Sequence, residues 1–142
     1  MLTLHVQLIH PKAVLPVRIH DGDAGYDLAS CEASIVPADH EVLIPTGFRL
    51  QFPEGFYARI VGRSSSRLRG LRISESIIDS GYRGEIFVCA SAWQGTVEIP
   101  QGERIAQLLL HPLVIASIEV SESISFQSPD GRGCNGFGST GG

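Results

Sequence analysis

The chain has 142 residues, of which 43% are hydrophobic and 18% charged, and 11 basic against 15 acidic side chains give a formal net charge of −4. This length and apolar content predict one globular domain and exclude a disordered chain, which would carry more charge and less apolar material. A non-specific binder of nucleic acid polymers is excluded as well, because such proteins need a basic footprint.

The N-terminal residues do not resemble a targeting signal, because they lack a positive start and polar or proline residues interrupt the apolar stretch. The longest apolar stretch, residues 108–116, contains His111 and Pro112 and is too short to span a bilayer. The three cysteines are odd in number and widely spaced, which predicts reduced thiols at Cys31, Cys89 and Cys134. These features predict a cytoplasmic protein without a membrane partner.

Eight prolines and sixteen glycines punctuate the chain, so no long helix is expected. Short apolar runs lie between them, and regularly spaced short strands are typical of an all-β sandwich or barrel. Residues 77–86 are predicted to form a hairpin with Ser80 and Gly81 in a tight turn and Asp79 where the strand enters it. The predicted strands lie at residues 41–44, 55–61, 85–89 and 96–99.

From about Ser121 the composition changes to serine, glycine and other polar residues. Such a segment cannot bury enough apolar surface to fold alone. The chain is therefore expected to consist of a β domain at residues 1–120 and a flexible arm at 121–142.

The segment GRSSSRLRG, residues 62–70, is the first candidate for a functional site. Six of the ten arginines lie between residues 59 and 83, where Glu75 and Asp79 are the only acids. Serine hydroxyls, guanidinium forks and backbone N–H groups can gather phosphate oxygens. An ordinary polar surface loop is an equally good interpretation of this segment alone.

The tail GRGCNGFGSTGG, residues 131–142, is the second candidate. It contains G-x-G-x-x-G twice, but no residues remain for a following helix, so a dinucleotide fold is excluded. A P-loop is excluded because Ser139 stands where the lysine should be. An arm with Arg132, Phe137, Ser139 and Thr140 would suit a lid that orders on a nucleotide, whereas a terminus without function is the alternative.

Asp79 is the third candidate, because a carboxylate with apolar neighbours can orient a water molecule and accept its proton. A lone aspartate before a Ser-Gly turn is more often a turn former. Asp27, in the segment GDAGYDL, is equally ambiguous. The histidines show no spacing typical of a zinc site.

Five segments stand in a fixed order along the chain: DAGYDL at 23–28, GRSSS at 62–66, IIDSGYRGEI at 77–86, GERIAQLLL at 102–110 and RGCNGFGSTG at 132–141. Together they resemble the homotrimeric dUTPase family, and the resemblance covers nearly the whole chain. It implies an all-β, distorted jelly-roll barrel with a glycine-rich C-terminal arm. It also implies Mg²⁺-assisted hydrolysis of dUTP to dUMP and diphosphate, which limits uracil incorporation into DNA and supplies dUMP for thymidylate synthesis.

The resemblance implies a role for three catalytic residues. Asp79 would be the base that orients water for attack on the α-phosphate, and Gln107 would contact that water and the phosphate chain. Asp27 would support Mg²⁺ through ordered water, the ion itself being held mainly by the triphosphate. In this family motifs one, two and four come from one subunit, the third from a neighbour, and the arm from the remaining subunit.

The resemblance also implies a substrate-binding set. In it the phosphate chain is held by Arg63, Ser64 and Ser65. Tyr82 lies against the deoxyribose, and the arm closes over the γ-phosphate and stacks Phe137 on the uracil. The backbone of Ile77, Ile78 and Phe87 reads the uracil edge. The whole implied set is Arg63, Ser64, Ser65, Ser76, Ile77, Ile78, Tyr82, Phe87, Arg132, Phe137, Gly138, Ser139 and Thr140.

Some observations leave alternatives open. Ser76 stands where the family usually has glycine, which affects the pocket, and Cys134 and Asn135 replace a pair that often contains glycine. A related dCTP deaminase is the nearest alternative enzyme, although Cys89 occupies the strand position where its glutamate base is expected. A nucleotide-sensing regulatory module that binds a protein partner is the alternative from another class.

Overall fold

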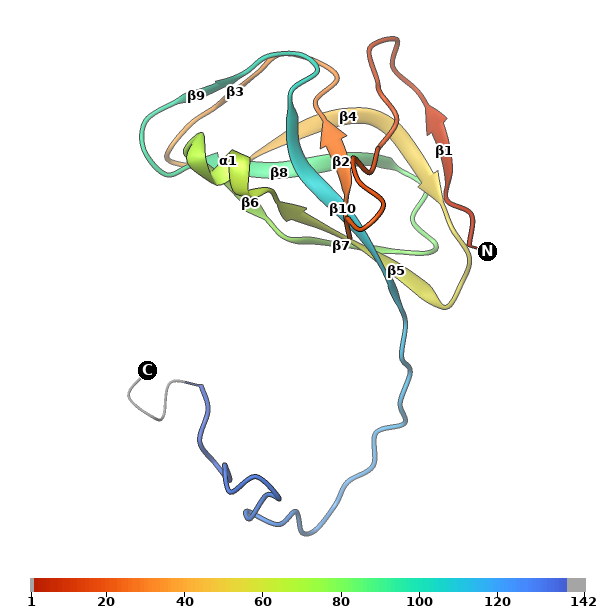
Figure 1. Ribbon diagram of the computed structural model, residues 1–142, viewed down its shortest axis with the longest axis vertical. Helices are drawn as coiled ribbons and strands as arrows, with labels where there is room; N and C mark the ends of the chain where they lie inside the picture. Colours follow the sequence, from red (N-terminus) through yellow and green to blue (C-terminus); the bar gives the residue numbers. More distant parts are fainter. Residues whose placement is uncertain (1, 138–142) are drawn as a thin grey trace.

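The structure is a computed structural model that describes residues 2–137. Its body is built almost entirely of short antiparallel strands, and a long C-terminal segment leaves that body after the last strand (Figure 1). The elements are β1 (His5–Leu8), β2 (Tyr26–Ala29), β3 (Ser34–Val36), β4 (Val42–Gln51), β5 (Phe56–Gly62), α1 (Ser64–Leu68), β6 (Leu71–Ser74), β7 (Ser76–Asp79), β8 (Glu85–Ala92), β9 (Val97–Ile99) and β10 (Arg104–Pro112).

Two four-stranded sheets form the barrel. The first has the strand order β1-β4-β8-β6 and the second the order β2-β10-β5-β7, while β3 and β9 make a small separate pair. Neighbours in each sheet are mostly distant in sequence and all run antiparallel. The all-β jelly-roll prediction is confirmed, and the four predicted strand segments lie in β4, β5, β8 and β9.

The core lies between the two sheets. In β8 every second residue from Ile86 to Ala92 is buried, and the residues between them face outward. Leu28, Ile60 and Leu108 of the second sheet are fully buried against this face. Burying each such side chain contributes about 1.5–3 kcal/mol to the stability of the fold. Because side chains alternate along a strand, burial of one set leaves the other set on the outer face, where it can take part in binding.

The predicted hairpin at residues 77–86 is wrong. β7 pairs with β5 in the second sheet, whereas β8 pairs with β4 and β6 in the first, so the two strands diverge. The tight turn itself exists, since the Tyr82 N–H donates to the Asp79 carbonyl at 3.1 Å. Both edges of β8 already have partners, and the turn therefore connects two sheets instead of two paired strands.

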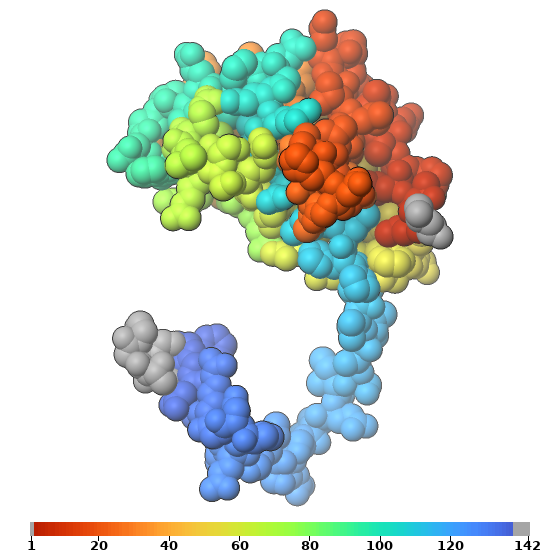
Figure 2. Space-filling model, viewed as in Figure 1, coloured from red at the N-terminus to blue at the C-terminus, as the bar shows by residue number. Residues whose placement is uncertain are grey.

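The C-terminal segment does not fold back onto the barrel. The N–H of Leu113 still donates to the Gly55 carbonyl at 2.8 Å, and the chain then runs outward (Figures 1 and 2). The domain boundary at residue 120 stays a prediction. Within residues 2–137, no helix is long and apolar enough to cross a membrane.

Candidate active site

Asp27, Arg63 and Gln107 come together at one end of the second sheet, and we call these three residues the Arg63 cluster. Gln107 of β10 lies directly opposite Asp27 of β2. The Arg63 Nε lies 3.1 Å from Asp27 Oδ1, and Arg63 Nη1 donates to the Arg104 carbonyl at 3.0 Å. The Asp27 side chain is only 12% exposed, so this carboxylate is held by cations and has little access to solvent.

Gly25 makes room for the Gln107 side chain. A Cβ placed on Gly25 would lie 2.2 Å from Gln107 Oε1, a distance that no real contact allows. The Gln107 amide also donates through Nε2 to the Gly62 carbonyl at 3.0 Å. Sequence reasoning missed the role of Gly25, because the close approach depends on a strand that is eighty residues away in the chain.

The three serines after Arg63 form the short helix α1, where a polar loop was one interpretation of the sequence. Arg63 has extended backbone angles and occupies the N-cap position without a side-chain cap. Ser66 is buried and its hydroxyl donates to the Ile105 carbonyl at 2.5 Å, which anchors α1 to β10. Ser64 and Ser65 are exposed in the first turn, where backbone N–H groups lack intrahelical acceptors.

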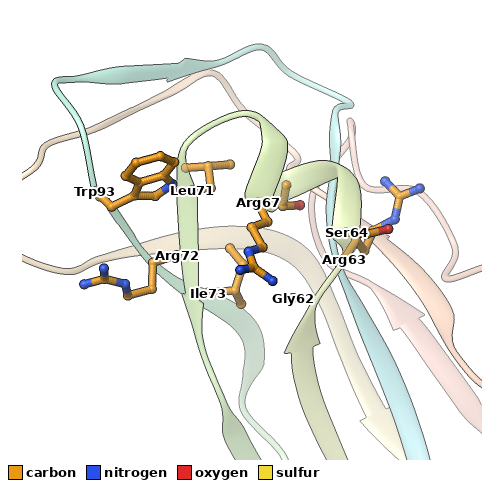
Figure 3. Close-up of a pocket in the computed structure, with 9 residues that line it drawn as sticks. Gly62, Arg63, Ser64, Arg67, Leu71, Arg72, Ile73 and Trp93 are labelled. Atoms are coloured by element: carbon orange, nitrogen blue, oxygen red, sulfur yellow. The ribbon is translucent and has the colours of Figure 1, made fainter.

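Cavities lie on both sides of α1. One of about 650 Å³ is lined by Arg63, Ser64 and residues of β6, together with Trp93 (Figure 3). The other, of about 610 Å³, is lined by Arg63, Ser65 and the start of β10. Figure 3 shows the Arg67 and Arg72 side chains on one side of the helix and the Arg63 guanidinium on the other. Arg63 therefore borders both cavities.

A separate cavity of about 270 Å³ opens where β7 and β8 diverge. Asp79 lies at the last position of β7 and is exposed at this cavity. The hydroxyl of Tyr82 donates to the Glu85 carbonyl at 2.9 Å, which fixes its ring at the same cavity. The lining residues are Leu43, Ile60, Ser76, Ile77, Ile78, Asp79, Tyr82, Glu85, Ile86 and Phe87.

The Arg63 cluster and Asp79 lie on one face of the second sheet but far apart. Gln107 lies opposite Val61 of β5, whereas Asp79 lies opposite Tyr57, four residues along the same strand. At about 3.4 Å per residue this places them about 14 Å apart along β5. A single chain therefore presents two separate candidate regions, which we call half-sites.

The arm residues lie away from both half-sites. Phe137 is fully exposed and has a φ of +46°, and Arg132 lies on the same detached segment (Figure 1). Gly138, Ser139 and Thr140 of the implied set lie outside the described residues.

Part of the arginine excess serves structural ion pairs. Arg59 hydrogen-bonds Glu75, and this bond lowers the pKa of the carboxyl. Arg69 pairs with Glu103 between α1 and the start of β10. In contrast, the Asp27 partner of Arg63 belongs to the candidate site itself.

Cys31 and Cys89 lack the environment of an activated nucleophile. Burial raises the pKa of the Cys31 thiol and that of Cys89, and the Glu41 carboxylate adds to the second shift. A catalytic cysteine needs the opposite shift, because the thiolate is the reactive form.

The described residues fit a magnesium ion held by a phosphate ligand. No group of three histidine, cysteine, aspartate or glutamate side chains suited to a metal is found in residues 2–137. Asp27 is the single carboxylate of the Arg63 cluster, and cations already face both its oxygens. Mg²⁺ retains several waters and commonly binds through one carboxylate and substrate phosphates, which this donor set can support.

Comparisons with known proteins agree with these features. The deoxyuridine 5'-triphosphate nucleotidohydrolase of Corynebacterium diphtheriae is 40% identical over 141 residues, which cover 96% of this chain and 91% of that protein. The protein of the same name from Paramecium bursaria Chlorella virus 1 is 36% identical over 143 residues, which cover 99% of each chain.

Solved structures give the same picture. A mutant dUTPase of Staphylococcus bacteriophage 80alpha with dUpNHpp has a TM-score of 0.86 and 28% identity, covering 97% of this chain and 98% of that chain. A mutant dUTPase from phage phi11 of S. aureus, described with a structural Mg(II) ion, has a TM-score of 0.79 and 26% identity. The match covers 85% of this chain and 97% of that chain.

The family implied by the five sequence motifs is confirmed at the level of the whole chain. A model of the dUTPase family matches residues 12–141, and the relatives above exceed 30% identity over nearly their full lengths. The chain belongs to the dUTPase family.

Proposed function

We propose that this chain hydrolyses dUTP to dUMP and diphosphate in a homotrimer whose subunits share each active site. The observation that carries the proposal is the cavity between β7 and β8, with Asp79 at its rim, on the sheet face that also bears the Arg63 cluster. The chemistry of these two half-sites matches the two ends of a nucleoside triphosphate.

The β7–β8 cavity would hold the deoxyuridine. Its volume of about 270 Å³ lies just below the range of about 300–1,000 Å³ for drug-sized ligands, which suits one base with its sugar. β7 is the last strand of its sheet, so its outer edge faces away from the other strands. Backbone groups of Ile77 and Ile78 on this edge would be able to contact the edge of a uracil. Phe87 would add a backbone contact from β8, and the fixed ring of Tyr82 would pack on the deoxyribose and exclude a 2′-hydroxyl.

Ser76 also lines this cavity, where the family usually has glycine. Its hydroxyl would stand beside the bound nucleoside and contribute to binding. The relatives described above are named nucleotidohydrolases, which favours hydrolysis over cytosine deamination.

The Arg63 cluster would hold the phosphate chain of the same substrate. The guanidinium fork of Arg63 and the exposed hydroxyls and N–H groups of Ser64 and Ser65 are suitable donors for phosphate oxygens. The Gln107 amide, held by the Gly62 carbonyl, would contact the attacking water and a phosphate oxygen.

Hydrolysis would proceed by attack of water on the α-phosphorus. The Asp79 carboxylate accepts the water proton as the new P–O bond forms, and the bond between the α-phosphorus and the bridging oxygen breaks to release diphosphate. Bound Mg²⁺ would neutralise charge on the triphosphate, with Asp27 supporting it through ordered water. Placement and charge neutralisation dominate this chemistry, so no covalent nucleophile is needed.

Assembly of several copies would unite the half-sites. Beyond β10 five large apolar residues stand at even positions of an extended chain and are 80–98% exposed, although Ile115 is apolar at an odd position and Glu122 interrupts the series. A tendency to alternate is typical of a half-buried strand, and these exposed side chains would be covered if the segment paired with a partner. We propose that further copies of the chain supply it. The residues are Val114, Ile118, Val120, Ile124 and Phe126.

Within that trimer the arm of one subunit would close over a site formed by the other two. Arg132 would contact the γ-phosphate and Phe137 would stack on the uracil, together with Gly138, Ser139 and Thr140. We place the enzyme in the cytoplasm, since its cysteines are unpaired and disulfides are uncommon there.

Product analysis with purified protein tests this function. Incubation with dUTP and Mg²⁺ should yield dUMP and diphosphate in equal amounts, with much slower turnover of dCTP, dTTP and UTP. Light scattering should give the mass of three chains. Release of ammonia, or no turnover of dUTP, would contradict the proposal.

A further inference from the structure

A hydrogen-bonded turn lies within the extended path of the arm, at residues 128–133. Asp130 Oδ1 accepts hydrogen bonds from the Ser128 hydroxyl at 2.8 Å and from the Arg132 N–H at 3.0 Å. The Ser128 hydroxyl oxygen in turn accepts from the Gly133 N–H at 2.8 Å, and the Ser128 carbonyl accepts from the Gly131 N–H at 3.0 Å. These bonds close the segment on itself without help from the barrel (Figure 1).

The backbone on either side of Arg132 requires glycine. Gly131 and Gly133 have φ angles of +73° and +55°, which side chains rarely adopt. A Cβ on Gly133 would also lie 2.9 Å from the Phe126 carbonyl oxygen. The two glycines therefore specify the conformation of this turn, and Arg132 lies between them.

The turn also directs the Arg132 side chain. Its Nε donates to the Asn135 carbonyl at 2.8 Å, while the Asn135 N–H donates to the Arg132 carbonyl at 3.1 Å. The hydrogen bond from Nε to the Asn135 carbonyl fixes the direction in which the two Nη groups of the guanidinium point. The outer edge of such a fork is suited to binding phosphate oxygens.

We propose that Asp130 is a positioning residue which, with Ser128, holds this turn before substrate binds, so that Arg132 reaches the triphosphate already oriented. The inference rests on the proposed function, in which Arg132 contacts the γ-phosphate. Ordering a mobile segment during binding costs conformational entropy, and apparent affinity falls with the fraction of molecules in the competent conformation. A pre-formed turn avoids that loss.

Three variants of the full-length enzyme test the proposal by steady-state kinetics with dUTP and Mg²⁺. Asp130→Ala removes the shared acceptor and should raise KM about 5- to 20-fold while kcat changes less than about twofold, as expected when fewer arms are competent. Asp130→Asn keeps an Oδ1 acceptor and should retain a KM near that of the wild type. Glu122→Ala removes a carboxylate from the same arm outside the turn and should have no effect.

Backbone ¹⁵N relaxation of the free protein supplies an independent measurement. The amides of residues 128–133 should be more rigid than those of 121–125 in the wild type and in Asp130→Asn, but not in Asp130→Ala. An unchanged KM in Asp130→Ala, or a disordered turn in the free wild type, would overturn the inference. Absence of dUTP turnover in a wild type with a rigid turn would instead contradict the proposed function.

Discussion

At the scale of single residues, the two aspartates that the sequence left ambiguous have different environments. Asp27 is almost enclosed and faces Arg63 and Arg104, so its charge is already compensated. Asp79 is exposed at the cavity between β7 and β8. We therefore propose Asp79 as the proton acceptor, and we keep for Asp27, beside Arg63, the proposed role of supporting Mg²⁺ through ordered water.

Replacing Asp79 by Asn tests this division of roles. The amide keeps the size of the side chain but cannot accept a proton from water, so kcat should fall about 10²- to 10⁴-fold. Binding of a non-hydrolysable dUTP analogue, measured by calorimetry, should remain within a few-fold of the wild type. A variant with substantial turnover would show that another group is the base.

Gly25→Ala tests the placement of Gln107. The new Cβ would lie 2.2 Å from Gln107 Oε1, so the amide must leave its position opposite Asp27. We expect kcat/KM for dUTP to fall at least about tenfold, in line with the effect of displacing a positioning group. Gly22→Ala is the matched control, because nothing lies within 4 Å of its Cβ, and it should behave like the wild type. Equal activity of the two variants would contradict the role of Gln107.

At the scale of elements, the divergence of β7 and β8 creates the cavity in which we propose that the nucleoside binds. The residues between them contain every local sign of a hairpin, including the tight turn that the structure retains. Local sequence specifies a turn, but the partner of each strand depends on which residues bury against the two sheets. The prediction failed at this point because β5 and β4 compete successfully for the edges of β7 and β8.

Gly84→Ala tests how this connection positions Tyr82. A Cβ at Gly84 would lie 2.3 Å from the Tyr82 hydroxyl oxygen and would displace the ring from its bond to Glu85. We expect a KM for dUTP raised about tenfold and a smaller preference for dUTP over UTP, since a fixed ring excludes the 2′-hydroxyl. Gly81→Ala, with nothing within 4 Å of the new Cβ, is the control. Unchanged selectivity in Gly84→Ala would argue against this role of Tyr82.

The turn in the arm should also depend on pH. The hydrogen bond from the Arg132 N–H lowers the pKa of Asp130 below its usual value near 3.9, and the Ser128 hydroxyl adds to the shift. Because the pKa is lowered in the turn, the ionised carboxylate stabilises it above the usual pKa, and this stabilisation is lost as the pH falls through the lowered value. The Arg132 amide shift should therefore stay constant from neutral pH to about pH 4 and change only below it. A transition near pH 6 would exclude Asp130 as its cause.

At the scale of the whole molecule, the separation of Asp79 from the Arg63 cluster along one sheet face supports the proposal that subunits share each active site. The two half-sites are separated by four residues along β5. A triphosphate fixed at the Arg63 cluster of one subunit can instead meet the nucleoside cavity of another. Closed rings of identical subunits provide such heterologous contacts with the same geometry at each site.

Subunit mixing tests this arrangement. Asp79→Asn and Arg63→Ala should each be nearly inactive, but refolding them together should restore activity at sites that combine an intact Arg63 with an intact Asp79. Random assembly would restore about a quarter of the sites, each in a ring built from both variants. Mixing without refolding is the control and should restore little. Failure to regain activity after refolding would mean that one chain supplies both residues of a site.

The fold class and several strands followed from the sequence, because short apolar runs between glycines and prolines carry that information locally. The family followed from the resemblance of five motifs in order. The close approaches at Gly25 and Gly84 did not follow from the sequence, since each depends on a side chain placed by tertiary structure. The role of Ser66 could not be predicted from the sequence either. Its neighbours Ser64 and Ser65 are exposed donors, whereas Ser66 anchors α1 to Ile105, and three identical letters give no sign of that difference.

The exposed alternation beyond β10 also bears on how the protein is made. We expect a newly synthesised subunit to finish its barrel with the apolar side chains beyond β10 still exposed, and exposed apolar segments of this kind are templates for aggregation. The serines and glutamates between the apolar positions act as gatekeepers that limit this hazard. If subunits associate as proposed, association is the last step of folding. The yield of refolded enzyme should then peak at an intermediate protein concentration, above which aggregation outcompetes correct assembly.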